Sequence, residues 1–259
     1  ISETAWTVYL MPVLLILSVG LTYRHIQFDK HYLRALEFHK GNDFQSVLRE
    51  SSLALKHGPF EPQAFFLQGD GYQAHGSLQE ASASYRAGLR YHPNAIQLLG
   101  GLGTTYALRN NLDRAELYYR KALEIYPGYY QMYNNLGGVF QKRGNLDAAI
   151  QSYQKALEAN QGYLDAYNNL GLAYLAAGRP DDAIQTYQKV LLQTPNDAVL
   201  HYNLADAYYQ KAQHGGSAMP QALASYEQFL RLWTGPRSQA EPARKRVAEL
   251  RKRLGGGPP

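Results

Sequence analysis

The chain has 259 residues, of which 45% are hydrophobic and 18% charged, a composition typical of an ordered protein. It contains no cysteine, which excludes disulfides, zinc–thiolate centres and thiol catalysis. The whole net charge of +5 is carried by residues 237–259. The rest of the chain is neutral, so no nucleic-acid partner is expected for the main body.

The first predicted element is an apolar helix at the N-terminus. No charged residue occurs between Glu3 and Arg24. As a helix, residues 4–23 would cover roughly 30 Å, the hydrocarbon thickness of a bilayer. Aromatic residues near both ends are typical of a membrane interface. We therefore expect residues 1–27 to be a hydrophobic anchor helix, in contact with a lipid bilayer or with the core of a helical assembly through residues 4–23.

Other interpretations of this segment stay open. A signal peptide fits less well, because no basic residues precede the apolar run. A helix packed in the core of a filament is the second alternative, although Glu3 does not stand where pilins carry their glutamate. Basic residues follow the segment and weakly favour a cytoplasmic body. Because the chain begins with isoleucine, we also expect a segment upstream that was cleaved or omitted.

From residue 28 onward the sequence repeats with a period of 34 residues, the first feature to seek in a chain of this kind. Glycine, alanine, tyrosine and proline each recur on this period. The expected structural positions are Gly69, Gly103, Gly137, Gly171, Ala81, Ala115, Ala149, Ala183, Pro93, Pro127 and Pro195. Apolar residues within each period are spaced by three and four, which predicts two helices with a loop between them.

This pattern resembles the tetratricopeptide repeat (TPR) family. The resemblance implies an all-α fold: a right-handed α-solenoid of helix–turn–helix repeats, here preceded by one hydrophobic, transmembrane-type helix. The expected parts are the anchor at 1–27, six units at 28–61, 62–95, 96–129, 130–163, 164–197 and 198–236, a basic capping helix at 237–254 and a flexible tail at 255–259. The first unit is degenerate, and the sixth contains five extra residues.

Several details within the units are also predicted. The second helix of a unit should begin near an aspartate, as at Asp113, Asp147 and Asp181, and should end before a proline. In the capping helix, the side chains of Val247, Leu250 and Leu254 should pack inward while the basic residues face water. Binding of this basic cluster to acidic lipid or a polyanion is the alternative.

No pattern in the sequence predicts catalysis. The eight histidines show no metal-ligand spacing, and no nucleophile–base pair has a recognisable signature. Glycines 100, 101 and 103 lie within a predicted helix, and no strand precedes them, so they do not indicate a phosphate-binding loop. We expect no enzymatic activity, no cofactor and no metal site.

The candidate binding residues are asparagines at the sixth place of successive units, namely Asn135, Asn169 and Asn203. In the TPR fold this place faces the concave groove, and the series is similar to the asparagine ladder of the protein O-linked N-acetylglucosamine transferases. An amide can donate to and accept from a peptide backbone at once. Tyr202, Asp206 and Tyr209 would add side-chain recognition. The alternative is that these asparagines bond neighbouring helices to one another.

The sequence therefore predicts a membrane-anchored TPR scaffold in the bacterial envelope. It would bind a protein or peptide in its groove and assemble a larger complex, and a homo-oligomer is left open. One alternative is the C-terminal repeat region of a polytopic glycan polymerase or ligase. Another is a filament subunit with its N-terminal helix in the filament core.

Overall fold

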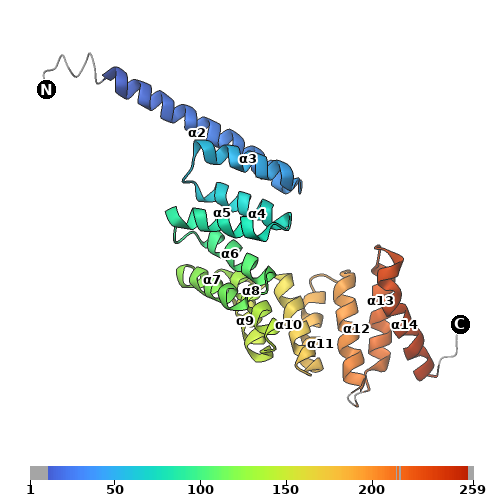
Figure 1. The fold of residues 1–259 in the computed structure, drawn as a ribbon. Coiled ribbons are helices and arrows are strands. Elements are labelled where there is room, and N and C mark those ends of the chain that lie inside the picture. Colours follow the sequence, from blue (N-terminus) through green and yellow to red (C-terminus); the bar gives the residue numbers. More distant parts are fainter. Residues whose placement is uncertain (1–10, 214, 216, 256–259) are drawn as a thin grey trace. The chain divides into compact units, whose positions relative to one another are not determined.

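The computed structural model describes residues 11–213, 215 and 217–255, and in these residues the fold is all-α, with thirteen helices and no strand (Figure 1). The helices are α2 (Met11–Lys40), α3 (Phe44–His57), α4 (Pro62–Ala74), α5 (Leu78–Tyr91), α6 (Ile96–Leu108), α7 (Leu112–Ile125), α8 (Tyr130–Lys142), α9 (Leu146–Ala159), α10 (Leu164–Ala176), α11 (Pro180–Leu191), α12 (Ala198–Gln213), α13 (Met219–Leu232) and α14 (Arg237–Arg253). They divide into two compact units, Ile1–Pro127 and Gly128–Pro259.

The helices from α2 to α13 form six successive antiparallel pairs, and from α4 to α11 the two helices of each pair come from the same 34-residue period. In the four pairs from α4 to α11 the glycine of the first helix lies against the tyrosine ring of the second. The pairs are Gly69–Tyr85, Gly103–Tyr119, Gly137–Tyr153 and Gly171–Tyr187, where a Cβ built on the glycine would lie 2.5, 2.6, 2.4 and 2.3 Å from the nearest ring atom. In these four pairs the period therefore encodes a close glycine–tyrosine contact, whereas Ala205 takes the glycine place in the sixth pair.

The alanine near the start of the second helix is fully buried in the same four pairs, at positions 81, 115, 149 and 183. Asp113, Asp147 and Asp181 lie in the first turn of their helices, as predicted. Asn111 and Asn145 cap α7 and α9 by accepting a hydrogen bond from a backbone N–H of the first turn.

Helix α2 extends well beyond its partner α3, so no other helix of the described residues lies beside its N-terminal half (Figure 1). It runs without a break through residues 27 and 28, and the expected boundary between anchor and first repeat falls inside it. Phe28 is its first buried residue and packs with Ala54 and Ala64. The packing of α2 against the repeats therefore begins at Phe28, on a helix that starts further upstream.

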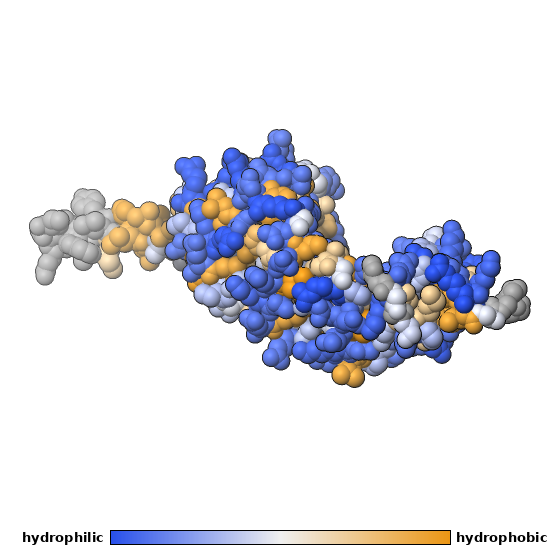
Figure 2. Space-filling view, turned by 90° about the horizontal axis from the view of Figure 1, so that it is seen from below, coloured by the Kyte–Doolittle hydropathy of each residue, from blue (hydrophilic) through white to orange (hydrophobic). Residues whose placement is uncertain are grey.

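The N-terminal half of α2 is apolar and open to solvent. Leu15, Ile16 and Leu21 are each about two-thirds exposed, and Figure 2 shows this stretch as a largely hydrophobic segment beside the grey N-terminal residues. Among the residues that the structure describes, no helix has both the length and the apolar character required to cross a membrane. Residues 4–10 of the expected span lie outside the described residues.

Helix α14 packs on α13 and closes the C-terminal end of the second unit. Val247 and Leu250 are buried as predicted, at 7% and 0% exposure. The prediction for Leu254 is wrong, because its side chain is 44% exposed. The helix ends at Arg253, so Leu254 does not continue the inward-facing stripe. Most of the expected tail, residues 256–259, lies outside the described residues.

Candidate functional site

The asparagine doublets of α8 and α10 join successive first helices of the second unit. The Asn169 Nδ2 donates to the Asn134 Oδ1 at 2.9 Å, and the Asn203 Nδ2 donates to the Asn168 Oδ1 at 2.5 Å. The second asparagine of one repeat therefore bonds to the first asparagine of the repeat before it. The structure supports the helix-bonding alternative for Asn169 and Asn203.

The doublets still leave amide groups for a ligand. Asn134, Asn135 and Asn168 are half-buried. Within the described part of the chain, the side-chain amide of Asn135 makes no hydrogen bond, and the side-chain amides of Asn134 and Asn168 use only their oxygen atoms. Their NH₂ groups are thus held in place by the amide contact without being consumed by it. Asn203 differs, because only 8% of it is exposed.

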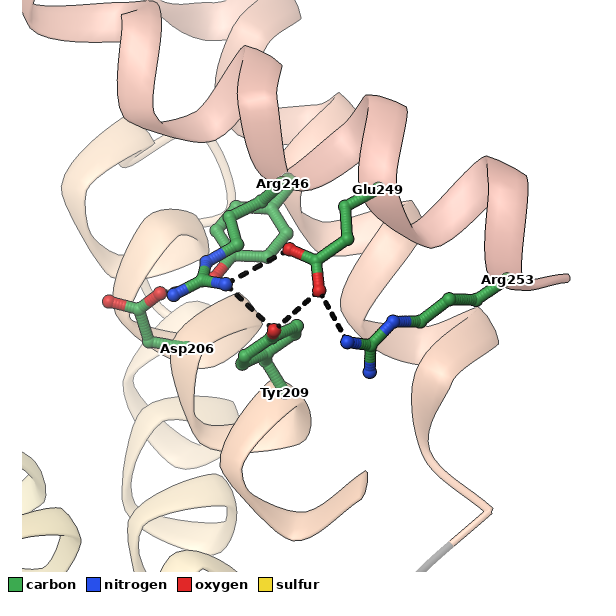
Figure 3. A network of polar contacts seen from close by, with 6 residues as sticks. Asp206, Tyr209, Arg246, Glu249 and Arg253 are labelled. Atoms are coloured by element: carbon green, nitrogen blue, oxygen red, sulfur yellow. Dashed lines mark hydrogen bonds and ion pairs between the residues drawn. The ribbon is translucent and has the colours of Figure 1, made fainter. Parts of the chain in front are cut away.

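At the last repeat, α14 lies over the residues expected to recognise ligand side chains (Figure 3). The Tyr209 hydroxyl donates to the Glu249 Oε1 at 2.9 Å and accepts from the Arg246 Nη1 at 2.7 Å. The Arg246 guanidinium also lies over the Tyr209 ring, 4.1 Å from its centre. Arg253 completes the network with an ion pair to Glu249 at 2.8 Å. Tyr209 is 7% exposed, which corrects the expectation that it is open to a ligand.

Asp206 and Tyr202 are engaged in the same region. The Tyr226 hydroxyl donates to the Asp206 Oδ1, and Figure 3 shows the Asp206 carboxylate beside the Arg246 guanidinium. Burial raises the pKa of Asp206, and the hydrogen bond from Tyr226 and the charge of Arg246 only partly offset this effect. The Tyr202 ring packs edge-on against Phe229 at 5.2 Å. These contacts help to pack α12 against α13 and α14.

The three predicted asparagines therefore have different environments, and only Asn135 is both accessible and unbonded. Sequence reasoning missed Asn134 and Asn168, the fifth-place members of the doublets. The signal was present, because the letters YNNLG occur at residues 133–137 and again at 167–171. A doublet is needed because donor and acceptor sit on neighbouring helices at adjacent places of the repeat.

No group of three or more histidine, aspartate or glutamate side chains that could hold a metal ion occurs among the described residues. The glycines at 100–103 lie within α6, as predicted. A Cβ built on Gly101 would lie 2.6 Å from the Tyr85 ring, so this glycine is required for packing.

The helix pairs, their 34-residue period and the glycine–tyrosine contact define a helical-repeat solenoid. A family model described as tetratricopeptide repeat matches residues 63–128 and 129–191, and one described as TPR repeat matches residues 174–211. The chain belongs to the tetratricopeptide repeat family. This family is a typical protein–protein interaction scaffold, and its members are generally non-catalytic.

Solved structures show the same fold. A TPR protein from Parabacteroides merdae is 20% identical, with a TM-score of 0.65 over 89% of this chain and 88% of that one. PilF of Pseudomonas aeruginosa is 22% identical, with a TM-score of 0.60 over 76% and 93%. YrrB, described as a TPR protein with an unusual peptide-binding site, is 20% identical, with a TM-score of 0.56 over 75% and 97%. No curated protein sequence matches significantly.

Proposed function

We propose that this protein is a membrane-anchored scaffold of the bacterial envelope, which holds an extended segment of a partner protein and so assembles a larger complex. The observation that carries the anchor is the N-terminal half of α2. Its leucine, isoleucine and valine side chains are exposed around the whole helix, where the repeats further along bury their apolar faces. Exposure of so large an apolar surface marks an interaction site, and a lipid bilayer or an apolar partner would cover it.

Flotation on liposomes tests the anchor. The full chain should float with vesicles of zwitterionic and anionic phospholipid, whereas a chain lacking residues 1–27 should stay in the aqueous fraction with its helical circular dichroism intact. A full-length variant with Ile16→Glu and Leu21→Glu is the matched control, since it removes apolar character without shortening α2. Equal flotation of all three proteins would contradict membrane anchoring by residues 1–27. Filamentous assembly of the full chain without lipid would favour the filament interpretation.

The groove part of the proposal rests on the amides of α8 and α10. The NH₂ groups of Asn134 and Asn168 are oriented by their contacts with the next repeat. Asn135 keeps its whole amide available. Amide donors at regular spacing suit the carbonyl groups of an extended backbone, which recur along a peptide whatever its side chains. YrrB, which has this fold and is described as having a peptide-binding site, supports such a role.

Titration of labelled peptides with scrambled sequences tests the groove. Asn135→Ala should weaken all of them to a similar degree, by roughly five- to tenfold, as expected for one net hydrogen bond. Gln151→Ala, on the exposed face of α9, is the control and should change nothing. Unchanged affinity in the Asn135 variant, or weakening confined to one peptide sequence, would contradict backbone reading.

A further inference from the structure

A hollow of about 630 Å³ lies in the first unit between α5 and α7, the second helices of adjacent repeats. Its apolar lining includes Leu89, Leu99 and Tyr118, together with alanines and a proline. Leu99 of α6 is 4% exposed and lies beneath the two outer helices. The volume is in the range of pockets that hold small ligands or a few peptide side chains.

Three cations border this hollow, and no carboxylate lines it. Arg86 and Arg90 stand one turn apart on α5, and Lys121 projects from α7. All three residues are exposed, and within the described part of the chain none of them takes part in an ion pair. The Arg86 Nε is fixed by donating to the Ser82 carbonyl at 3.1 Å, and the Lys121 Nζ lies 5.7 Å from the centre of the Tyr118 ring.

The second unit contains the same hollow two repeats later, with different chemistry. It measures about 550 Å³ and lies between α9 and α11. Gln154 and Glu158 stand there at the places of Arg86 and Arg90, while Lys189 keeps the place of Lys121. The first hollow therefore carries three positive charges, and the second has one of each sign.

The repeat architecture does not require the arginines, because it forms the equivalent hollow without them. We propose that the hollow between α5 and α7 is a second binding site, for a peptide segment that combines acidic and aliphatic side chains. Arg86 and Arg90 would pair with its carboxylates, since a guanidinium matches a carboxylate with two parallel hydrogen bonds. The leucines and Tyr118 would receive its aliphatic groups. This site is separate from the asparagine groove of the second unit.

The lining favours a peptide over other anionic ligands. A nucleic acid or a phosphate group would use the cations but leave the apolar floor uncovered. The charge is also confined to three side chains at one hollow, whereas a nucleic-acid footprint requires a basic stripe along the surface. A peptide in which acidic and aliphatic residues alternate can pair its carboxylates with the three cations and place its aliphatic groups against the apolar lining.

Exchange of the two chemistries tests the proposal on the full chain in zwitterionic detergent. Arg86→Gln with Arg90→Glu gives the first hollow the residues that the second has at these two places, and Gln154→Arg with Glu158→Arg gives the second hollow two arginines. The probe is a fluorescent peptide of alternating leucine and glutamate. The first exchange should weaken binding roughly a hundredfold, as expected for two lost charge-assisted hydrogen bonds. The second exchange should add a second site, read from the stoichiometry.

Several outcomes would overturn this site. Unchanged affinity after the first exchange would remove it. A serine–glutamate peptide that binds as tightly as the leucine–glutamate peptide would show that the floor contributes nothing. An oligonucleotide or an anionic vesicle that binds more tightly than the peptide, and loses binding on the same exchange, would assign the arginines to another class of ligand. Because the groove is expected to bind this peptide as well, the first exchange is measured in the Asn135→Ala background, and Gln151→Ala is the control that should leave the affinity unchanged.

Discussion

The two units of the chain build the same repeat but bond their first helices to one another differently. In the first unit His39 of α2 pairs with Asp70 of α4, and the Thr105 hydroxyl of α6 donates to the Gln73 Oε1 of α4 at 3.0 Å. In the second unit the joints are amide to amide, as in the 2.9 Å contact from Asn169 to Asn134. The glycine–tyrosine contact inside a repeat occurs in both units, at Gly69 and Gly103 in the first and at Gly137 and Gly171 in the second.

This difference separates two kinds of information in the sequence. The contact inside the four glycine-containing hairpins tolerates little substitution, because a tyrosine ring occupies the space where any side chain on the glycine would lie. The joint between hairpins has several solutions, because any donor and acceptor of suitable length can span it. If this is right, the contact inside a hairpin should contribute most to stability, and the contribution of the bonds between hairpins should differ between the two units.

The largest expected effect is at the hairpin contact. Gly171→Leu and Gly103→Leu should each destabilise the fold by about 3 kcal/mol or more, because a Cβ alone would meet the tyrosine ring at 2.3 and 2.6 Å. Gln151→Leu, on an exposed face, should stay within about 0.5 kcal/mol. Urea unfolding measures all three. A loss in one unit only would show that the two units do not share the same frame.

The joints should rank next. Asn203→Ala removes a buried donor and leaves the Asn168 Oδ1 without its partner, so we expect a loss of about 1–2 kcal/mol. Asn135→Ala should be neutral or slightly stabilising, because alanine is the better helix former. Thermal unfolding of the two variants separates these outcomes. Equal losses would mean that the amide contact does not contribute to stability.

Two tyrosine hydroxyls provide a matched pair between the units. The Tyr153 hydroxyl donates to the Gln141 Oε1 at 2.9 Å, whereas the Tyr85 hydroxyl is buried without a partner in the described structure. Tyr153→Phe should cost about 1 kcal/mol, and Tyr85→Phe should be neutral or stabilise by up to about 1 kcal/mol. Opposite shifts in melting temperature are expected. A loss in the Tyr85 variant as large as in the Tyr153 variant would point to a bound water at that hydroxyl.

The smallest expected effects are in the pH dependence of two carboxylates. Burial acts to raise the pKa of Glu50, but the hydrogen bond from His31 and nearby positive charges outweigh it and lower the pKa. Glu50 therefore adds stability above its usual pKa, and this contribution is lost as pH falls through the folded value. The pKa of Asp206 is raised in the folded protein. Its protonated form therefore adds stability at low pH, and this contribution is lost as the pH rises through the folded-state pKa.

Glutamine and asparagine substitutions measure this contrast. Glu50→Gln should lower the melting temperature at pH 7, and the difference from wild type should shrink toward pH 3. Asp206→Asn should raise the melting temperature at pH 7, and that difference should also vanish toward pH 3. Thermal scans at several pH values follow both. Shifts of the same sign at pH 7 would contradict the opposite environments assigned to the two carboxyl groups.

The repeat frame could be predicted from sequence because every element of it recurs with the period. Gly137 and Tyr153 each belong to a series, so their pairing follows once the hairpin is inferred. The inter-repeat bonds were not predictable in the same way. The contact from Asn203 to Asn168 depends on the relative height of two helices from different repeats, a tertiary property that no single repeat specifies.

The end of the chain shows a second limit. The sequence indicates a capping helix and its buried stripe, but it does not indicate which surface that helix covers. Tyr209 occupies a groove place by its repeat number, yet α14 lies over it and engages its hydroxyl. Leu254 follows the stripe in spacing but lies past the last helical residue. Position in a repeat therefore predicts an environment only where another repeat follows.

The self-contained hairpin has a consequence for how such a chain changes its length in evolution. Each glycine finds its tyrosine within the same 34 residues, so duplication or deletion of one whole period leaves every other hairpin complete. The five extra residues of the sixth unit extend α12 to Gln213 and lengthen its connection to α13, which begins at Met219, so this pair tolerates an insertion shorter than one period. Genetic rearrangement can therefore lengthen the solenoid by whole repeats. The asparagine contacts between repeats and the residues that line the hollows can change by substitution without affecting the hairpins.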